Sequence, residues 1–174
     1  MIIEIAKEIL KDFPIYETLP ASISGKYHVG ETAKEHIETA VNVMKHLCDE
    51  FDIRGTEREK LIAATYLHDI GIYAITEKGQ VDNPSWKYYK ETDFSRCPAL
   101  MQLHPLVSAS LLNRYKDKIN EYMLKELKRL VSVHMSHWYP MCPKPNNLNE
   151  YLNCVADYVA SRGTGILEYK NKEE

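Results

Sequence analysis

The chain has 174 residues, of which 44% are hydrophobic, and its 22 lysines and arginines face 25 aspartates and glutamates, for a formal charge of −3. A chain of this length and composition buries enough apolar surface to form its own core, which excludes a disordered or fibrous protein. The small negative charge disfavours a general binder of duplex nucleic acid, because such proteins depend on a broad basic face.

The sequence shows no membrane span and no secretory signal. No stretch approaches the roughly 20 apolar residues that a span requires, and Glu4 interrupts the apolar N-terminal run. The four cysteines form no C-x-x-C pair and are too sparse for a disulfide-rich secreted domain. We therefore expect one cytoplasmic domain over residues 1–174, with reduced thiols, a core within about 20–162 and a frayed tail at 163–174.

Helical spacing of the apolar residues dominates the chain. Only seven glycines and eight prolines interrupt it, which predicts an all-α helical bundle of about six or more helices. The first helix is expected at about 1–12. An irregular segment follows at 13–28, rich in turn formers and longer than a simple connection requires.

Two capping patterns mark the next two helices. Thr32 with Glu35 forms a capping box, and Thr56 with Glu59 repeats the pattern. Gly71 is expected to terminate the second of these helices. The apolar stripe of the first comprises Ala33, Ile37, Ala40, Val41, Met44, Leu47, Cys48 and Phe51.

Residues 72–98 have no clear period and predict a long loop or lid. Pro105 is expected in a first helical turn, so that a helix begins near His104. A further helix is expected over about 118–136, and the basic stretch 114–129 is interpreted as a solvated face. The last helix is expected to bury a stripe of Leu148, Leu152, Val155 and Val159, with Asp157 beside it.

Histidines and aspartates on the apolar faces are the chain's chemical feature. Asp69 directly follows a histidine, and Asp157 lies in an apolar context, where a carboxylate is costly unless it is paired or binds metal. Imidazole and carboxylate together suit a divalent metal, and bundles build such sites from facing helices. Taken singly, each residue is more often explained by packing; their order on successive helices favours a metal site. The four histidines are His36, His68, His104 and His134.

The sequence around these residues resembles the HD-domain metal-dependent phosphohydrolases, whose pattern is H…HD…D with additional histidines in two-metal members. Residues 66–71 (YLHDIG) are similar to the end of the family's HD helix, and 104–109 (HPLVSA) to the start of its third-histidine helix. Residues 131–137 followed by Pro143-Lys-Pro145 resemble HD-type 3′→5′ exoribonucleases. The resemblance extends from about Pro20 to Arg162.

The resemblance implies one or two divalent ions, with Mn, Mg, Fe, Ni or Zn as candidates. Asp69 would bridge them and, with His68, lie at the catalytic centre. His137, expected on the same helical face as His134, would be an additional ligand or, in the favoured alternative, a hydrogen-bond donor to a ligand. The first metal would be held by His36, His68, Asp69 and Asp157, and the second by Asp69, His104 and His134.

Substrate contacts are expected from two irregular segments. Lys26 and His28 are the best placed cations to hold a phosphate and assist catalysis, although a solvated loop lysine is an equal alternative. Trp86 and Tyr88, among further aromatic and basic residues, are candidates for stacking on a base. The alternative for these aromatic residues is that they pack against the core beneath a long loop.

The resemblance and the residues together predict a divalent-metal-dependent phosphohydrolase. The preferred form is a phosphodiesterase that acts on nucleotides or short single-stranded nucleic acid by attack of a metal-activated water at phosphorus. This fits the lack of G-x-S-x-G, P-loop and G-x-G-x-x-G motifs. The alternatives are a 5′-nucleotidase-type phosphomonoesterase with one metal, and a non-catalytic nucleotide-binding module. The partner is a phosphorylated small molecule, nucleotide or short single strand; no membrane is involved, and the oligomeric state is left open.

Overall fold

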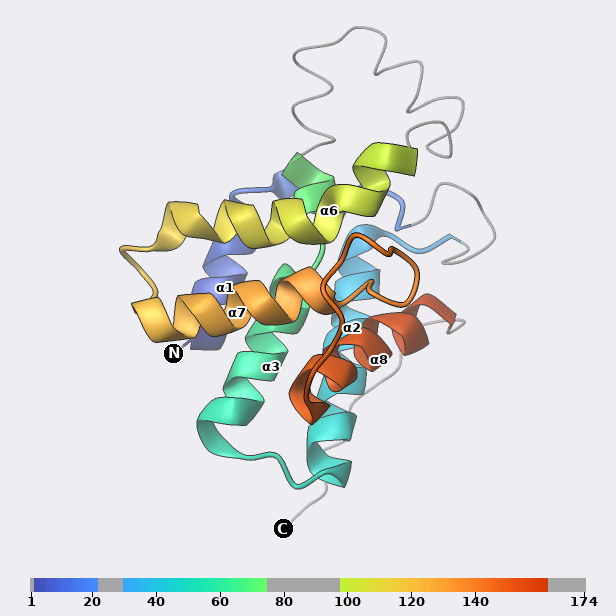
Figure 1. Ribbon diagram of the computed structural model, residues 1–174. Coiled ribbons are helices and arrows are strands. Elements are labelled where there is room, and N and C mark those ends of the chain that lie inside the picture. Colours follow the sequence, from blue (N-terminus) through green and yellow to red (C-terminus); the bar gives the residue numbers. More distant parts are fainter. Residues whose placement is uncertain (1, 22–29, 75–97, 163–174) are drawn as a thin grey trace, which may run out of the picture.

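The computed structural model describes residues 2–21, 30–74 and 98–162 (Figure 1). Within these ranges the protein contains helices and one isolated β-bridge but no strand, so the all-α prediction is confirmed. The helices are α1 (Ile2–Lys11), η1 (Pro14–Glu17), α2 (Ala33–Glu50), α3 (Gly55–Leu67), α6 (Pro98–Leu111), η3 (Leu112–Tyr115), α7 (Glu121–Val133) and α8 (Leu148–Arg162), together with a short helical segment at 70–74.

Helix α3 lies at the centre of the bundle and packs against α1, α2, α7 and α8. Its central residues Leu61, Ala63 and Ala64 are fully buried, as expected of a helix that is enclosed on several sides. α8 packs along α2, and α6 packs along α7 (Figure 1). No helix in the described ranges has the length and apolar character that crossing a membrane requires.

The start of α2 is fixed by the predicted capping box. The Thr32 hydroxyl accepts from the Glu35 backbone N–H at 3.2 Å, and the Glu35 carboxylate accepts from the Thr32 backbone N–H at 2.7 Å. An antiparallel bridge between Pro20 and Thr32 holds the preceding chain against this end of the helix. The predicted stripe is buried apart from Leu47, which is partly buried, and Phe51, which follows the last helical residue and is exposed.

The second predicted cap and the predicted terminator are wrong. α3 begins at Gly55, one residue before Thr56, and its N-cap is Arg54, whose side chain makes no capping bond. Gly71 does not end the helix: it lies within the helical segment 70–74, so residues 72–74 of the predicted loop are helical, and residues 75–97 of it lie outside the described residues. Its role is close packing, since a Cβ atom there would lie within 3.0 Å of Ser108 atoms and of the His104 carbonyl oxygen.

Pro105 lies inside α6 rather than in its first turn, because the helix already begins at Pro98. An internal proline removes one backbone hydrogen bond and costs about 3 kcal/mol or more. Burial of His104, Ser108 and Leu111, together with packing of α6 against α7, offsets this cost.

The buried face of α8 differs from the predicted stripe. Leu152, Ala156 and Ala160 face the core, together with Asp157. Val155 and Val159, which were predicted to be buried, are exposed, as is Leu148.

The prediction that the whole of 114–129 is a solvated face is wrong at its last residue. Arg129 donates to both oxygens of the buried Glu150 carboxylate, at 3.0 and 2.9 Å, and so joins α7 to the start of α8.

Candidate metal centre

Six side chains from five parts of the bundle converge on one buried volume. His36 lies in the first turn of α2, and His104 lies in α6. His68 and Asp69 directly follow α3, and His134 directly follows α7. Asp157 lies on the buried face of α8. The sequence predicted these six residues as a set, and the fold brings all of them together.

The first histidine pair is His36 and His68. Their Nε2 atoms are 3.2 Å apart. Asp157 Oδ1 lies 3.1 Å from His36 Nε2 and 3.5 Å from His68 Nε2. Asp69 Oδ2 lies 3.3 Å from His68 Nε2 and 3.8 Å from His36 Nε2. Two imidazoles and two carboxylates therefore surround one point.

The second histidine pair is His104 and His134, whose Nε2 atoms are 3.0 Å apart. Asp69 faces this pair with its other oxygen: Oδ1 lies 3.2 Å from His104 Nε2 and 3.5 Å from His134 Nε2. The two oxygens of one carboxylate thus face two different histidine pairs. Donor atoms of His36, His68 and Asp69 lie within 4.8 Å of one another, and so do those of Asp69, His104 and His134, which gives two metal-sized groups sharing Asp69.

Helix ends orient two of the four imidazoles. His68 is the C-cap residue of α3, and its Nδ1–H donates to the Thr65 carbonyl at 2.6 Å. His134 is the C-cap residue of α7, and its Nδ1–H donates to the Val131 carbonyl, also at 2.6 Å. The last carbonyls of a helix have no backbone partner within it, so each histidine satisfies one of them. Because Nδ1 carries the proton, the Nε2 lone pair points into the cluster, as metal ligation requires.

The electrostatics of the cluster call for positive charge at its centre. Burial lowers the pKa of His68, but the Asp69 and Asp157 carboxylates outweigh burial and raise it well above its usual value. Burial raises the pKa of Asp69, but the charge of His68 and hydrogen bonds from His104 and His134 hold it well below its usual value. The pKa of Asp157 is lowered by His36 and His68 against the same effect of burial.

The donor set fits divalent metal ions. Imidazole nitrogens and carboxylate oxygens are ligands for Mn, Fe, Ni and Zn. The alternative to a cation at this point is a set of lone pairs and carboxylate oxygens facing one another at 3.0–3.8 Å, which is unfavourable in a buried site. A proton on His68 would serve the same purpose in the metal-free protein, as its raised pKa indicates.

Sequence reasoning missed two features that support the cluster. The Gly71 N–H donates to Ser108 Oγ at 2.8 Å, which locks the segment after Asp69 against the helix that carries His104. The ring of Tyr139 stands edge-on to that of His104, with centroids 6.1 Å apart. The Gly and Ser identities are a local signal for close packing, whereas nothing in the sequence around Tyr139 indicates its contact.

One predicted site residue in the described part of the chain, His137, does not join the cluster. His137 lies in the turns after α7, not on the helix, so it does not share a helical face with His134. Its ring contacts Trp138 and Tyr158, with centroids 5.1 and 5.6 Å away. The proposed substrate contacts Lys26, His28, Trp86 and Tyr88 lie outside the described residues.

Comparison with known families matches residues 34–162 to the HD domain. This range contains all six clustered side chains and covers well over half of the chain. No match was found among curated proteins or among solved structures. On this basis the chain belongs to the HD-domain family, and it is a metal-dependent phosphohydrolase of that superfamily.

Proposed function

We propose that this enzyme is a two-metal phosphodiesterase that acts on nucleotides or on short single-stranded nucleic acid. The observation that carries the proposal is the orientation of Asp69, whose two oxygens face separate histidine pairs. A single-metal phosphomonoesterase needs only the first group of ligands and has no use for buried His104 and His134. The presence of both pairs therefore favours the two-metal form.

In this proposal the first metal is held by His36, His68, Asp69 and Asp157, and the second by Asp69, His104 and His134. The mixed nitrogen and oxygen donors suit Mn, Fe, Ni or Zn better than Mg, which prefers oxygen ligands. When bound, two divalent ions lower the pKa of a coordinated water and offset charge on the phosphoryl oxygens.

The chain itself sets the direction from which the substrate approaches. The side chains of the four histidines are at most 4% exposed, whereas those of Asp69 and Asp157 retain 14% and 12% exposure. The cluster is therefore open to solvent on its carboxylate side. An anionic phosphate meets two carboxylates there, so binding requires that their charge be compensated. The histidine side excludes water and holds the ligands in place.

A substrate screen of the metal-loaded protein tests the proposal. The chain is loaded with Mn²⁺ and assayed against bis-p-nitrophenyl phosphate, nucleoside monophosphates and short single-stranded RNA and DNA. Hydrolysis of the diesters without hydrolysis of the monoesters is expected. Release of phosphate from nucleoside monophosphates alone would instead identify a 5′-nucleotidase-type phosphomonoesterase. Protein treated with EDTA is the control and should be inactive.

Lys26 and His28 remain the proposed phosphate contacts. A charge-assisted contact that strengthens in the transition state contributes a few kcal/mol, so Lys26→Ala should lower kcat/KM by roughly 10²-fold or more. Lys26→Arg should restore part of the loss, and neither variant should change the metal content. A kcat/KM within about twofold of wild type for Lys26→Ala would remove Lys26 from the site.

A further inference from the structure

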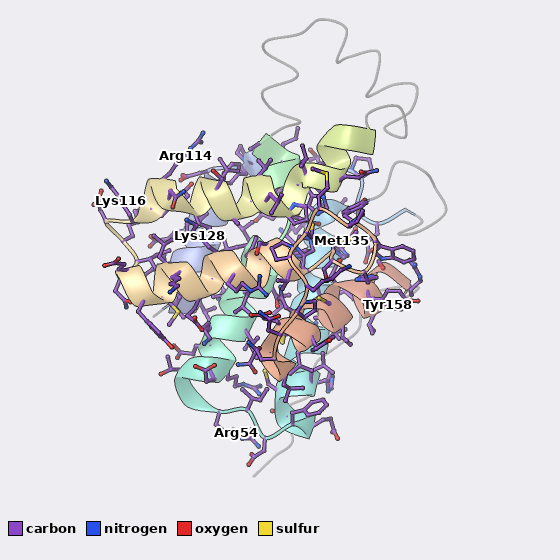
Figure 2. All side chains as sticks on the ribbon, in the orientation of Figure 1. Arg54, Arg114, Lys116, Lys128, Met135 and Tyr158 are labelled. Atoms are coloured by element: carbon purple, nitrogen blue, oxygen red, sulfur yellow. The ribbon has the colours of Figure 1, made fainter. Side chains whose placement is uncertain are left out.

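A second concave site lies beside the metal centre, between the segment that joins α7 to α8 and the outer face of α8. The pocket has a volume of about 580 Å³ and is lined by Pro145, Val155 and Tyr158, with His137 and Lys144 among the polar residues. Figure 2 shows Tyr158 on the same side of the molecule as Met135, where this joining segment begins. The metal cluster does not use this pocket.

The pocket adjoins the metal centre through α8. Cys154 lines the pocket and lies three residues before Asp157, so both are on neighbouring positions of one helical side, with Cβ atoms about 5–6 Å apart. The Cys154 thiol also donates to the Val133 carbonyl at 3.2 Å, directly before the clustered His134. A ligand could therefore occupy the pocket and the metal centre together.

The pocket is bordered by an exposed aromatic platform. The rings of Trp138 and Tyr158 stack at an interplanar angle of 17°, with centroids 6.3 Å apart. The Arg162 guanidinium lies 4.7 Å from the centroid of Tyr158 and 5.5 Å from that of Trp138. Trp138 is 50% exposed and Tyr158 is 42% exposed. Large aromatic surfaces held open in this way, next to a cation, are what single-stranded nucleic acids stack upon.

The charge of the pocket selects the class of ligand. Among the described residues that line it there is no carboxylate, although the chain has 25 acidic residues. Lys144 supplies a positive charge, and the Ser136 carbonyl takes one of its three N–H donors at 2.6 Å. By contrast, the pocket at the start of α8 is lined by three glutamates. An apolar, aromatic-bordered pocket with a cation fits a ligand that combines a flat ring with a phosphate.

We propose that this pocket is a base-binding subsite, which holds the base of a nucleotide adjacent to the phosphate at the metal centre. The inference rests on the proposed function, since it names the substrate class of the same site. It also explains why an exposed apolar surface persists on α8. Nucleotides and single strands are the favoured occupants, because the aromatic border of the pocket matches their bases and the Lys144 cation matches their phosphates.

Trp138 provides a direct readout of binding. The chain has two tryptophans, Trp86 and Trp138, so Trp86→Phe leaves Trp138 as the only tryptophan and keeps an aromatic ring at position 86, which was itself a candidate for stacking on a base. In this background the Mn²⁺-loaded protein is titrated with single-stranded penta-deoxyadenylate carrying phosphorothioate linkages, which slow hydrolysis. Saturable quenching of Trp138 is expected. The same oligomer without its bases should bind at least about tenfold more weakly, as loss of base stacking implies.

Two matched substitutions on α8 localise the effect. Val155 lines the pocket and is 39% exposed, whereas Val159 does not line it and is 37% exposed. Val155→Glu places a carboxylate in the pocket and should raise Kd for the oligomer about tenfold or more. Val159→Glu adds the same charge to the same helix and should leave Kd within about twofold. Circular dichroism checks that both variants keep their helices.

Three results would overturn the proposal: no quenching of Trp138, equal effects of the two glutamates, or equal binding of the oligomer without bases. A wild-type dimer that Val155→Glu dissociates, seen by sedimentation, would also overturn it by assigning the pocket to contact between copies. Failure of the proposed function can be distinguished from failure of the base-binding subsite. It would appear as absence of diesterase activity in the metal-loaded protein, whereas the fluorescence titration reports on the pocket with or without turnover.

Discussion

The shared carboxylate of Asp69 gives the sharpest test of the two-metal centre. Asp69→Asn keeps the size of the side chain but removes its charge and one of its two acceptor oxygens. Because Oδ2 faces His36 and His68 while Oδ1 faces His104 and His134, the substitution weakens both groups of ligands at once. We therefore expect the variant to lose both metal equivalents.

The size of the effect follows from the same geometry. Metal ions supply several kcal/mol of charge stabilisation in the transition state, and each 1.36 kcal/mol is a factor of ten in rate. Loss of both ions should thus lower kcat by roughly 10³-fold or more. In the metal-free protein the variant should also lower the pKa of His68, since Asp69 is the carboxylate whose charge most strongly raises it.

Metal stoichiometry, turnover of bis-p-nitrophenyl phosphate and circular dichroism are the three measurements. Asp49→Asn is the matched control, because the Asp49 side chain, like that of Asp69, is partly buried and ion-paired, to Arg58 at 2.6 Å, but lies 13 residues from His36 along α2. The control should keep both metal equivalents. If Asp69→Asn retains two equivalents per chain with near wild-type turnover, the bridging role of Asp69 is refuted. Loss of a single equivalent would restrict Asp69 to one group of ligands.

Three further variants probe the surroundings of the site. His104→Ala should lose one metal equivalent and keep the other, as measured by metal analysis, because the first group of ligands remains complete. Gly71→Ala should destabilise the protein by about 1–3 kcal/mol in urea unfolding and weaken the second metal, because its Cβ would push Ser108 and the His104 carbonyl away. Burial raises the pKa of Glu150, but hydrogen bonds from Arg129 outweigh it and lower the pKa, so its stabilising contribution is present above about pH 4.3 and is lost as the pH falls through the folded-state value. Between pH 7 and pH 3 the unfolding free energy of Glu150→Gln should therefore fall less steeply than that of wild type; parallel curves would contradict this.

The ligand set was predictable because some members have a local signal and because the order of all six along the chain resembles the pattern of the HD-domain family. His68 and Asp69 form a dipeptide at the end of an apolar helix, and Asp157 is a carboxylate in an apolar run. A charged residue is costly to bury alone, so the presence of such residues on successive helices indicates that they meet in one buried site. The grouping of the histidines around Asp69 was implied only by the resemblance to the HD-domain family, because the residues by themselves do not show how five parts of the bundle meet. The sequence alone does not show which oxygen of Asp69 faces which histidines.

The face of α8 was mispredicted because the helix is apolar on more than one side. Leu148, Leu152, Val155 and Val159 follow helical spacing, and so do Leu152, Ala156 and Ala160. Periodicity alone does not choose between two stripes when both are apolar. In the structure the stripe with the smaller side chains is buried. These side chains allow α8 to pack along α2, and this packing places Asp157 at the metal centre. The larger side chains were left for the outer surface and its pocket.

The predictions that Gly71 ends a helix and that Pro105 begins one were wrong for a different reason. Gly71 and Pro105 were interpreted as local punctuation, which is their usual role. In the structure the two residues lie at one packing contact. Gly71 packs against the turn of α6 that includes the His104 carbonyl, and Pro105 is the next residue in that turn. A contact between segments 33 residues apart outweighs the local preference of either residue. The absence of a side chain at Gly71 permits the approach that places His104 near Asp69.

The positions at which α3 and α7 end therefore determine the metal geometry more directly than the spacing of the histidines does. His68 and His134 each occupy the C-cap position, and each donates its Nδ1–H to the carbonyl three residues earlier. Were either helix to continue one more turn, that carbonyl would be taken by a backbone N–H. The histidine would then lose the bond that fixes its tautomer and aims its Nε2 lone pair at Asp69. Termination of these two helices, which costs backbone hydrogen bonds, is in this way a requirement of the site itself.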